Sequence, residues 1–322
     1  MHIPDGFLDS KTAVATGVLA AAGLGVALRH ARRHLPPRRV PLLGLAAAFV
    51  FAAQMLNFPV LAGTSGHLIG GVLTAVLLGP SAAVIVISAV LIVQCLMFAD
   101  GGISALGANI FNMAIIGGTL GWAIYYPVSR VFKGRFGTVL AAAFASWCST
   151  VLAAVACAGE LTVAGKARWS VVLPAMAGVH MLIGIGEGLI TALVLSAVAR
   201  ARPELLQPER PATARRSYGT VLAYGVLIAL GLALFVSPLA SKWPDGLDKT
   251  AEVLGFQTRA AGPIMPAPIP DYAMPGIHGS VLATSIAGAV GTVVAFVLAW
   301  LLARTLAPRT RTENSPSSSP TP

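Results

Sequence analysis

Long apolar stretches, separated by short polar segments rich in glycine, proline and arginine, dominate the chain. An α-helix that crosses the hydrocarbon core of a bilayer needs about 20 mostly apolar residues. Stretches that approach this length lie at residues 12–28, 40–57, 68–80, 81–98, 108–129, 137–158, 171–199, 218–240 and 279–303. The third is short and continues through Gly79 and Pro80 into the fourth, which predicts a half-helix or re-entrant segment covered by protein. The pattern predicts an all-α, polytopic membrane helix bundle with about seven spans plus two C-terminal spans.

The composition supports a membrane protein. Of the 322 residues, 56% are hydrophobic and 11% are charged, whereas soluble domains contain about 25% charged residues. The three cysteines lie within apolar stretches and form no C-x-x-C pair, which argues against a disulfide framework and a cysteine zinc site. The same composition excludes disordered, collagen-like and coiled-coil proteins.

The basic residues predict the orientation of the bundle. With nine spans, 16 of the 22 Lys and Arg residues fall on one side. They are Arg29, Arg32, Arg33, Arg38, Arg39, Arg130, Lys133, Arg135, Arg200, Arg202, Arg210, Arg215, Arg216, Arg304, Arg309 and Arg311. The positive-inside rule assigns that side to the cytoplasm, which places the N-terminus and the 241–278 segment outside. It also explains the net charge of +10 without a nucleic-acid partner.

Two polar segments divide the chain. Residues 201–217 are rich in Pro and Arg and predict a cytoplasmic linker, and residues 305–322 form a Pro/Ser/Thr tail that we expect to be disordered. The start MHIPDGFLDS has no basic segment before its apolar stretch, unlike a signal peptide. We therefore expect Met1 to persist, and the bulky His2 to disfavour its removal.

His2 is the first candidate for chemistry. An N-terminal amine, the next peptide nitrogen and the imidazole of residue 2 can close two small chelate rings around one metal ion. Three nitrogens then lie in one plane, an arrangement that Ni(II) favours. Met1 would act through its amine and not its sulfur. The alternative is that His2 is an isolated polar residue.

His67 can supply a fourth nitrogen. It lies in the stretch NFPVLAGTSGHLIGG, on the same predicted face as His2. The glycines around it allow an irregular loop to fold into the bundle. The alternative is a single imidazole at the membrane interface. Asn57 and Ser65, in the same stretch, are candidates for outer-shell support or for the path of the ion.

His180 and Glu187 lie within the seventh apolar stretch, in AGVHMLIGIGEGLIT. They are seven residues apart and therefore share one face of a helix. Ionisable residues inside a membrane usually face the interior of the bundle. They are predicted either to support a ligand from the second shell or to join neighbouring helices as a buried polar pair.

The chain lacks several catalytic motifs. It contains no P-loop pattern, no H-E-x-x-H and no serine nucleophile elbow, which argues against ATP binding, a metalloprotease and a serine hydrolase. An enzyme that uses His180 and Glu187 in acid–base chemistry is one alternative hypothesis. A stand-alone secondary permease or channel for a divalent cation is another.

The start MHIPDGFLD and the segment GTSGHLIGG together resemble the CbiM/NikM family, the substrate-specific membrane components of energy-coupling factor transporters for cobalt and nickel. The resemblance covers about residues 1–200. It implies that the amine of Met1, the backbone nitrogen and imidazole of His2, and the imidazole of His67 bind the metal. The resemblance also implies a prokaryotic cell membrane, with no permanent cofactor and with Ni(II) or Co(II) as the transported substrate.

Residues 218–304 resemble the two-span companion subunit of the same systems, of the PDGLE/CbiN type. The motif here is Pro244-Asp245-Gly246-Leu247-Asp248, with Asp where the family has Glu. The resemblance implies that this region helps to load the metal. His278 and Met274 in the 241–278 segment are candidates for loading or for simple loop filling.

The resemblance further implies partners: a transmembrane coupling subunit and a pair of cytoplasmic ATPases. The small-residue faces of the first two spans either pack inside the bundle or dock the coupling subunit. The leading hypothesis is a non-enzymatic capture component of an ATP-driven importer for Ni(II) or Co(II).

Overall fold

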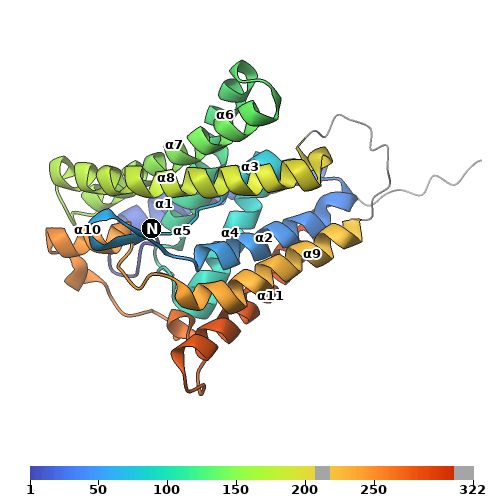
Figure 1. Ribbon diagram of the computed structural model, residues 1–322. Helices are drawn as coiled ribbons and strands as arrows, with labels where there is room; N and C mark the ends of the chain where they lie inside the picture. Colours follow the sequence, from blue (N-terminus) through green and yellow to red (C-terminus); the bar gives the residue numbers. More distant parts are fainter. Residues whose placement is uncertain (207–217, 308–322) are drawn as a thin grey trace, which may run out of the picture.

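The structure, a computed structural model, describes residues 1–206 and 218–307, which form a helical bundle with one short β-hairpin (Figure 1). The first part contains α1 (Ser10–His34), α2 (Val40–Gln54), α3 (Gly71–Leu78), α4 (Pro80–Phe98), α5 (Leu106–Asn109), α6 (Gly121–Val131), α7 (Gly134–Val163) and α8 (Trp169–Ala201). The second part contains α9 (Tyr218–Gly231), α10 (Gly246–Leu254) and α11 (Ser280–Leu306). The predicted all-α class is confirmed. Most of the predicted linker and tail, residues 207–217 and 308–322, lies outside the described residues.

Seven helical stretches in the described residues are long and apolar enough to cross a membrane. One of them passes from α5 through a π-helical stretch, Ile110–Leu120, into α6. The two other predicted segments correspond to α2, with 15 residues, and α3, with 8 residues. α3 is joined to α4 at Gly79, whose φ of 95° favours glycine. α3 is therefore a half-helix, in agreement with the sequence-based interpretation.

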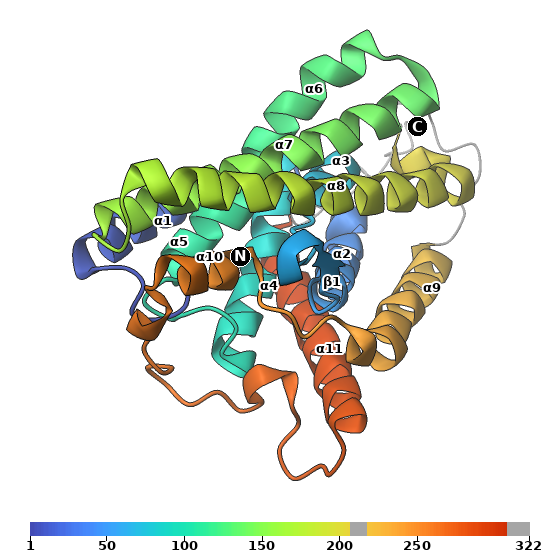
Figure 2. The ribbon, with the colours of Figure 1, turned by 60° about the vertical axis from the view of Figure 1, so that its left-hand side comes forward.

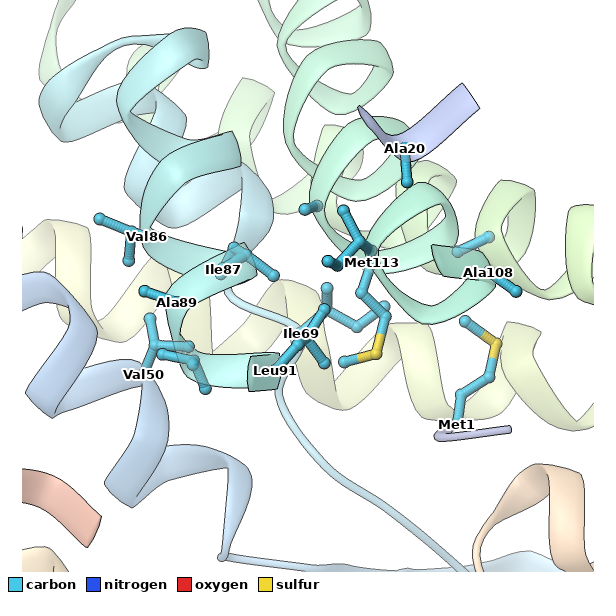
Figure 3. Packing of buried hydrophobic residues seen from close by; sticks show 14 of the residues in the cluster. Met1, Ala20, Val50, Ile69, Val86, Ile87, Ala89, Leu91, Ala108 and Met113 are labelled. Atoms are coloured by element: carbon cyan, nitrogen blue, oxygen red, sulfur yellow. The ribbon is translucent and has the colours of Figure 1, made fainter. Parts of the chain in front are cut away.

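The central helix of the bundle is α4. Of the most apolar 18 residues of α4, 78% are buried. Side chains from several faces of the helix, including Val86, Ile87 and Leu91, pack against neighbouring elements (Figure 3). A helix that is apolar on all sides is typical of such an interior position. Met113, from the π-helical stretch, and Met1 belong to the same buried cluster. The N-terminus is thus part of the core.

Small residues form the contact between α2 and α11. Every fourth residue of α11 from Ala283 to Ala303 is buried, and Gly44 of α2 lies so close to Phe296 and Trp300 that a Cβ would be tightly confined. Such faces allow close helix packing in membranes. The corresponding pattern on α1 differs, because Ala21 and Gly25 are exposed. The small-residue face of α2 therefore packs within the chain, whereas part of the α1 face stays accessible.

A short antiparallel hairpin precedes α3. Strand β1 (Phe58–Val60) pairs with β2 (Thr64–Gly66), with Phe58 opposite Gly66. Gly66 lies against α8, where an added Cβ would come within 2.6 Å of Ile183. Only a residue without a side chain allows this approach, so the glycine brings the hairpin into the bundle. The apolar pattern did not predict the hairpin, because its strands have only three residues each.

Candidate metal site

The residues before α1 are inserted into the bundle. Ile3 and Phe7 are buried. The Ile3 peptide N–H donates to Asn109 Oδ1 at 2.8 Å, and the Ile3 carbonyl accepts from Asn109 Nδ2 at 3.1 Å and from the Gly102 N–H at 2.8 Å. Both polar groups of the Ile3 backbone are satisfied, as a buried segment requires. This anchor fixes the positions of the two residues before it, Met1 and His2.

The amine of Met1 and the imidazole of His67 lie in direct contact. The Met1 nitrogen is 2.7 Å from His67 Nε2, and the rings of His2 and His67 are stacked with their centroids 5.0 Å apart. Two nitrogens bound at right angles to one ion, with bonds of about 2.0 Å, are separated by about 2.8 Å. The amine and His67 thus have the spacing of neighbouring ligands around a single ion.

The imidazole of His2 has two polar neighbours. Its Nε2 is 3.1 Å from Gln94 Oε1, and its Nδ1 is 3.3 Å from Asp100 Oδ1. A ligating histidine usually donates its other ring N–H to an outer-shell acceptor. If Nε2 donates to Gln94, Nδ1 carries the lone pair that the chelate hypothesis requires; in this structure Nδ1 lies beside Asp100, so binding of an ion would replace that contact. Asp100 in turn accepts from the Tyr272 hydroxyl at 2.6 Å.

Burial keeps both imidazoles in the form that can bind a metal. It lowers the pKa of His2, and the nearby Asp100 opposes this only in part. Burial also lowers the pKa of His67, well below its usual value, and the Met1 ammonium and His2 act in the same direction. Both rings are therefore neutral at neutral pH. Metal ligands must be deprotonated, so neither ring has to lose a proton before it binds an ion.

Glu187 of α8 positions the segment that carries His67. Its carboxylate accepts the peptide N–H groups of Ile69 at 2.6 Å and of Gly70 at 2.9 Å. Gly70 has a left-handed φ of 77°. His67 Nδ1 contacts the Leu68 carbonyl at 3.1 Å, and donation from Nδ1 leaves Nε2 free toward the amine. Glu187 therefore acts on the imidazole through the backbone and not by direct contact.

His180 lies beside this group. Its Nδ1 is 2.7 Å from the Met176 carbonyl, the geometry of donation within α8. Together with Met1, His67, Asp245 and Gly246, it lines a cavity of about 10 Å³, which has room for about one water-sized particle. His180 is thus adjacent to the amine and His67 without a direct hydrogen bond to either.

Two family models match the chain. The model described as the cobalt uptake substrate-specific transmembrane region, CbiM, matches residues 2–205, and the PDGLE domain model matches residues 219–308. The chain belongs to the CbiM family. The resemblance inferred from the N-terminal and His67 motifs is confirmed, and the chain is a multi-pass membrane component of nickel and cobalt transport.

Two nickel transport proteins match most of the chain. A putative fused nickel transport protein, NikMN, of Archaeoglobus fulgidus is 38% identical and covers 94% of this chain and 98% of the relative. The fused nickel transport protein NikMN of Rhodobacter capsulatus is 34% identical and covers 91% of this chain and 94% of its own length. The crystal structure of a truncated transition metal transporter is 35% identical, with a TM-score of 0.57, and covers 62% of this chain and 99% of that one.

Asn57 and Ser65 connect the CbiM part to the PDGLE part. Ser65 Oγ donates to the Trp243 carbonyl at 2.7 Å, and the Ser65 N–H donates to the Pro244 carbonyl at 2.8 Å. The Asn57 carbonyl accepts from the Ser241 N–H at 2.8 Å. These hydrogen bonds of both residues join the two parts of the chain, and none of them involves the Met1 amine.

Met274 and His278 are not brought to the Met1 amine. Met274 packs against the main hydrophobic cluster, and its N–H donates to the Ala283 carbonyl at 3.3 Å. His278 is exposed, just before α11. A role for either residue in loading stays a prediction.

Sequence reasoning missed three site residues of this CbiM-family protein. Gln94 and Asp100 contact His2, and Asp245 contacts the Met1 amine. Gln94 is the one amide in the apolar stretch at residues 81–98. It could have been predicted to contact another polar group, because a buried amide needs a hydrogen-bond partner. Asp245 belongs to the PDGLD motif, which had served only as a family signature.

Replacement of Glu187 tests its support of His67. In Glu187→Gln the side-chain amide keeps one acceptor, so one of the two N–H groups of Ile69 and Gly70 loses its partner. We expect unfolding to become easier by about 1–3 kcal/mol and metal affinity to fall by about 10–100-fold, measured by thermal unfolding and Ni(II) titration. Glu160→Gln is the matched control, because Glu160 is a buried membrane glutamate that accepts from Asn112 instead. Equal affinity losses in both variants would contradict the assignment.

Proposed function

We propose that the chain is the substrate-binding membrane component of an ATP-driven energy-coupling factor importer, and that it captures Ni(II) or Co(II) at the outer face. The observation that carries this proposal is the 2.7 Å contact between the Met1 nitrogen and His67 Nε2. The family match and the nickel transport relatives support the same function. ATP hydrolysis is assigned to partner subunits, in keeping with the lack of a P-loop in the sequence.

In the proposed mechanism, the ion is bound by the Met1 amine, the His2 peptide nitrogen and imidazole, and His67 Nε2. Gln94 orients the imidazole of His2, and Glu187 holds the segment that carries His67. The amine and the peptide nitrogen each release a proton when they bind, so metal capture liberates protons. Four nitrogens in a plane suit Ni(II), and the cobalt description of the family keeps Co(II) as the second candidate substrate.

The partners in this proposal are a transmembrane coupling subunit and two cytoplasmic ATPases. Reorientation of the whole component, driven by those ATPases, would then deliver the ion inside. The exposed small residues of α1, Ala21 and Gly25, remain a candidate docking face. The face of α2 is less suitable, because it packs against α11. A stand-alone permease would need no such partners.

Uptake in cells distinguishes the two transport mechanisms. Cells that produce the chain with its coupling subunit and ATPases are expected to accumulate radiolabelled Ni(II) or Co(II), and cells that produce the chain alone are not. A parallel measurement with both ions identifies the preferred substrate. A Walker-lysine variant of the ATPases serves as the control for partner assembly without ATP hydrolysis. Full uptake by the chain alone would overturn the proposal in favour of the permease.

A further inference from the structure

The PDGLE part crosses the metal site and is fastened there by backbone hydrogen bonds. Besides the Ser65–Pro244 bond, the Ala261 N–H donates to the Asp5 carbonyl at 2.8 Å and the Ile269 N–H donates to the Met97 carbonyl at 2.9 Å. Figure 2 shows α10 beside the N-terminus, with the rest of the 241–278 segment passing over the same side of the bundle. The segment therefore covers Met1 from one side.

Asp245 is the residue of this segment that reaches the amine. Its Oδ2 accepts from the Met1 ammonium at 2.6 Å, and its Oδ1 accepts the N–H groups of Leu247 at 2.7 Å and Asp248 at 2.9 Å. Oδ1 thus caps α10, which fixes the carboxylate, while Oδ2 is directed at the metal site. The 2.6 Å contact between Oδ2 and the Met1 ammonium is that of an ion pair.

The two partners of this ion pair differ in their exposure to solvent. The side chain of Asp245 is 16% exposed, whereas the whole Met1 residue, its amine included, is 5% exposed. An ion that arrives from solvent therefore meets the carboxylate before the amine. Because Oδ2 and the amine nitrogen are 2.6 Å apart, one ion with bonds of about 2.0–2.2 Å can contact both atoms at once.

The charges at the site point to a role in exchange and not in final binding. The metal-free site carries one positive charge on the ammonium. The chelate also carries one, since a divalent ion is offset by the peptide nitrogen, which has lost its proton. In the intermediate of the exchange, the ion is already bound to the neutral amine but the His2 peptide nitrogen still keeps its proton. The site then carries the full double positive charge of the ion. A fixed carboxylate stabilises this intermediate more than either end state.

We propose that Asp245 is a transient ligand of the metal: it binds the arriving ion through Oδ2, hands it to the Met1 amine, and acts in reverse on release. This inference rests on the proposed function. In the exchange, the Oδ2–ammonium contact opens, a bond forms between Oδ2 and the ion, and the ammonium and the His2 peptide each release one proton to solvent. The bond from Oδ2 then breaks as the four nitrogens close around the ion.

The test compares Asp245→Asn with the wild-type full-length chain in rapid-mixing Ni(II) binding and in competition with a chelator. Asn is as good a helix N-cap as Asp, so α10 is retained. We expect association and dissociation both to slow by about tenfold or more, with little change in Kd. Asp245→Ser, whose side chain also caps a helix but is too short to reach the amine, is expected to slow both rates as Asp245→Asn does. Asp248→Asn, a charge loss on the same helix, is the control with wild-type kinetics.

Each outcome has one meaning. Unchanged rates in both Asp245 variants would overturn the transient-ligand role. Faster dissociation with unchanged association would also overturn it, because Asp245 would then contribute to the bound state. Slowing in Asp248→Asn to the same extent would assign the effect to general charge. A wild-type chain that binds no Ni(II) at equilibrium would instead contradict the proposed function, which separates the two failures.

Discussion

One residue added before Met1 is expected to abolish tight Ni(II) binding, although no side chain is removed. The extension converts the amine into a peptide group, whose nitrogen has no lone pair available for a metal unless it loses its proton. The added residue also has little space, because the Met1 nitrogen already lies 2.6 Å from Asp245 and 2.7 Å from His67. Loss of an outer-shell partner costs about 10–100-fold in metal affinity, so loss of a ligand that closes one of the two chelate rings should cost more.

The measurement is a titration of Ni(II) and Co(II) into the purified chain with its native start and into the extended form. A second, longer extension that ends in a protease site leaves Met1 first after cleavage, and cleavage should restore one-to-one binding, which controls for misfolding. Equal binding before and after cleavage would remove the amine from the site. The search for ligands would then turn to His67, His180 and the 241–278 segment.

His67→Ala is expected to weaken binding by more than about a hundredfold, beyond the range of outer-shell substitutions. The reason is geometric, because His67 Nε2 is the atom in contact with the amine. His180→Ala should have a smaller effect, since His180 lines the adjacent cavity but its described hydrogen bond is to the Met176 carbonyl.

The same titration, with His30→Ala as the control, measures both variants. His30 is exposed on α1 and pairs with His34. Equal losses in His67→Ala and His180→Ala would contradict the assignment of His67 as a ligand and His180 as a neighbour. A loss in His30→Ala would indicate that adventitious surface binding contributes to the signal.

Much of the fold could be predicted from the sequence because the bilayer imposes a simple length rule on helices. The predicted stretch at 279–303 became α11, Ser280–Leu306, and the stretch at 171–199 became α8, Trp169–Ala201. The hairpin before His67 and helix α10 were missed. Each is short, and each is held by contacts to a distant part of the chain, such as Ser65 with Pro244.

The candidate site was predictable to the extent that its chemistry is local. His2 next to an N-terminal amine is a chelate visible in two residues, and Glu187 was found because a carboxylate in an apolar helix needs a partner. Asp245 could not be found in this way. It is 244 positions from Met1 in sequence, and an aspartate before a helix already has a sufficient local explanation as an N-cap.

The backbone hydrogen bonds between the 241–278 segment and the CbiM part have a kinetic consequence. Each such bond contributes only about 0.5–1.5 kcal/mol net, too little to hold a separate small protein in place. Within one chain, however, the segment is present at an effective concentration in the millimolar range. Covalent linkage thus allows the 241–278 segment to remain over Met1 at rest while its hydrogen bonds to the CbiM part break and re-form one by one. Stable closure of the site and its opening are therefore compatible.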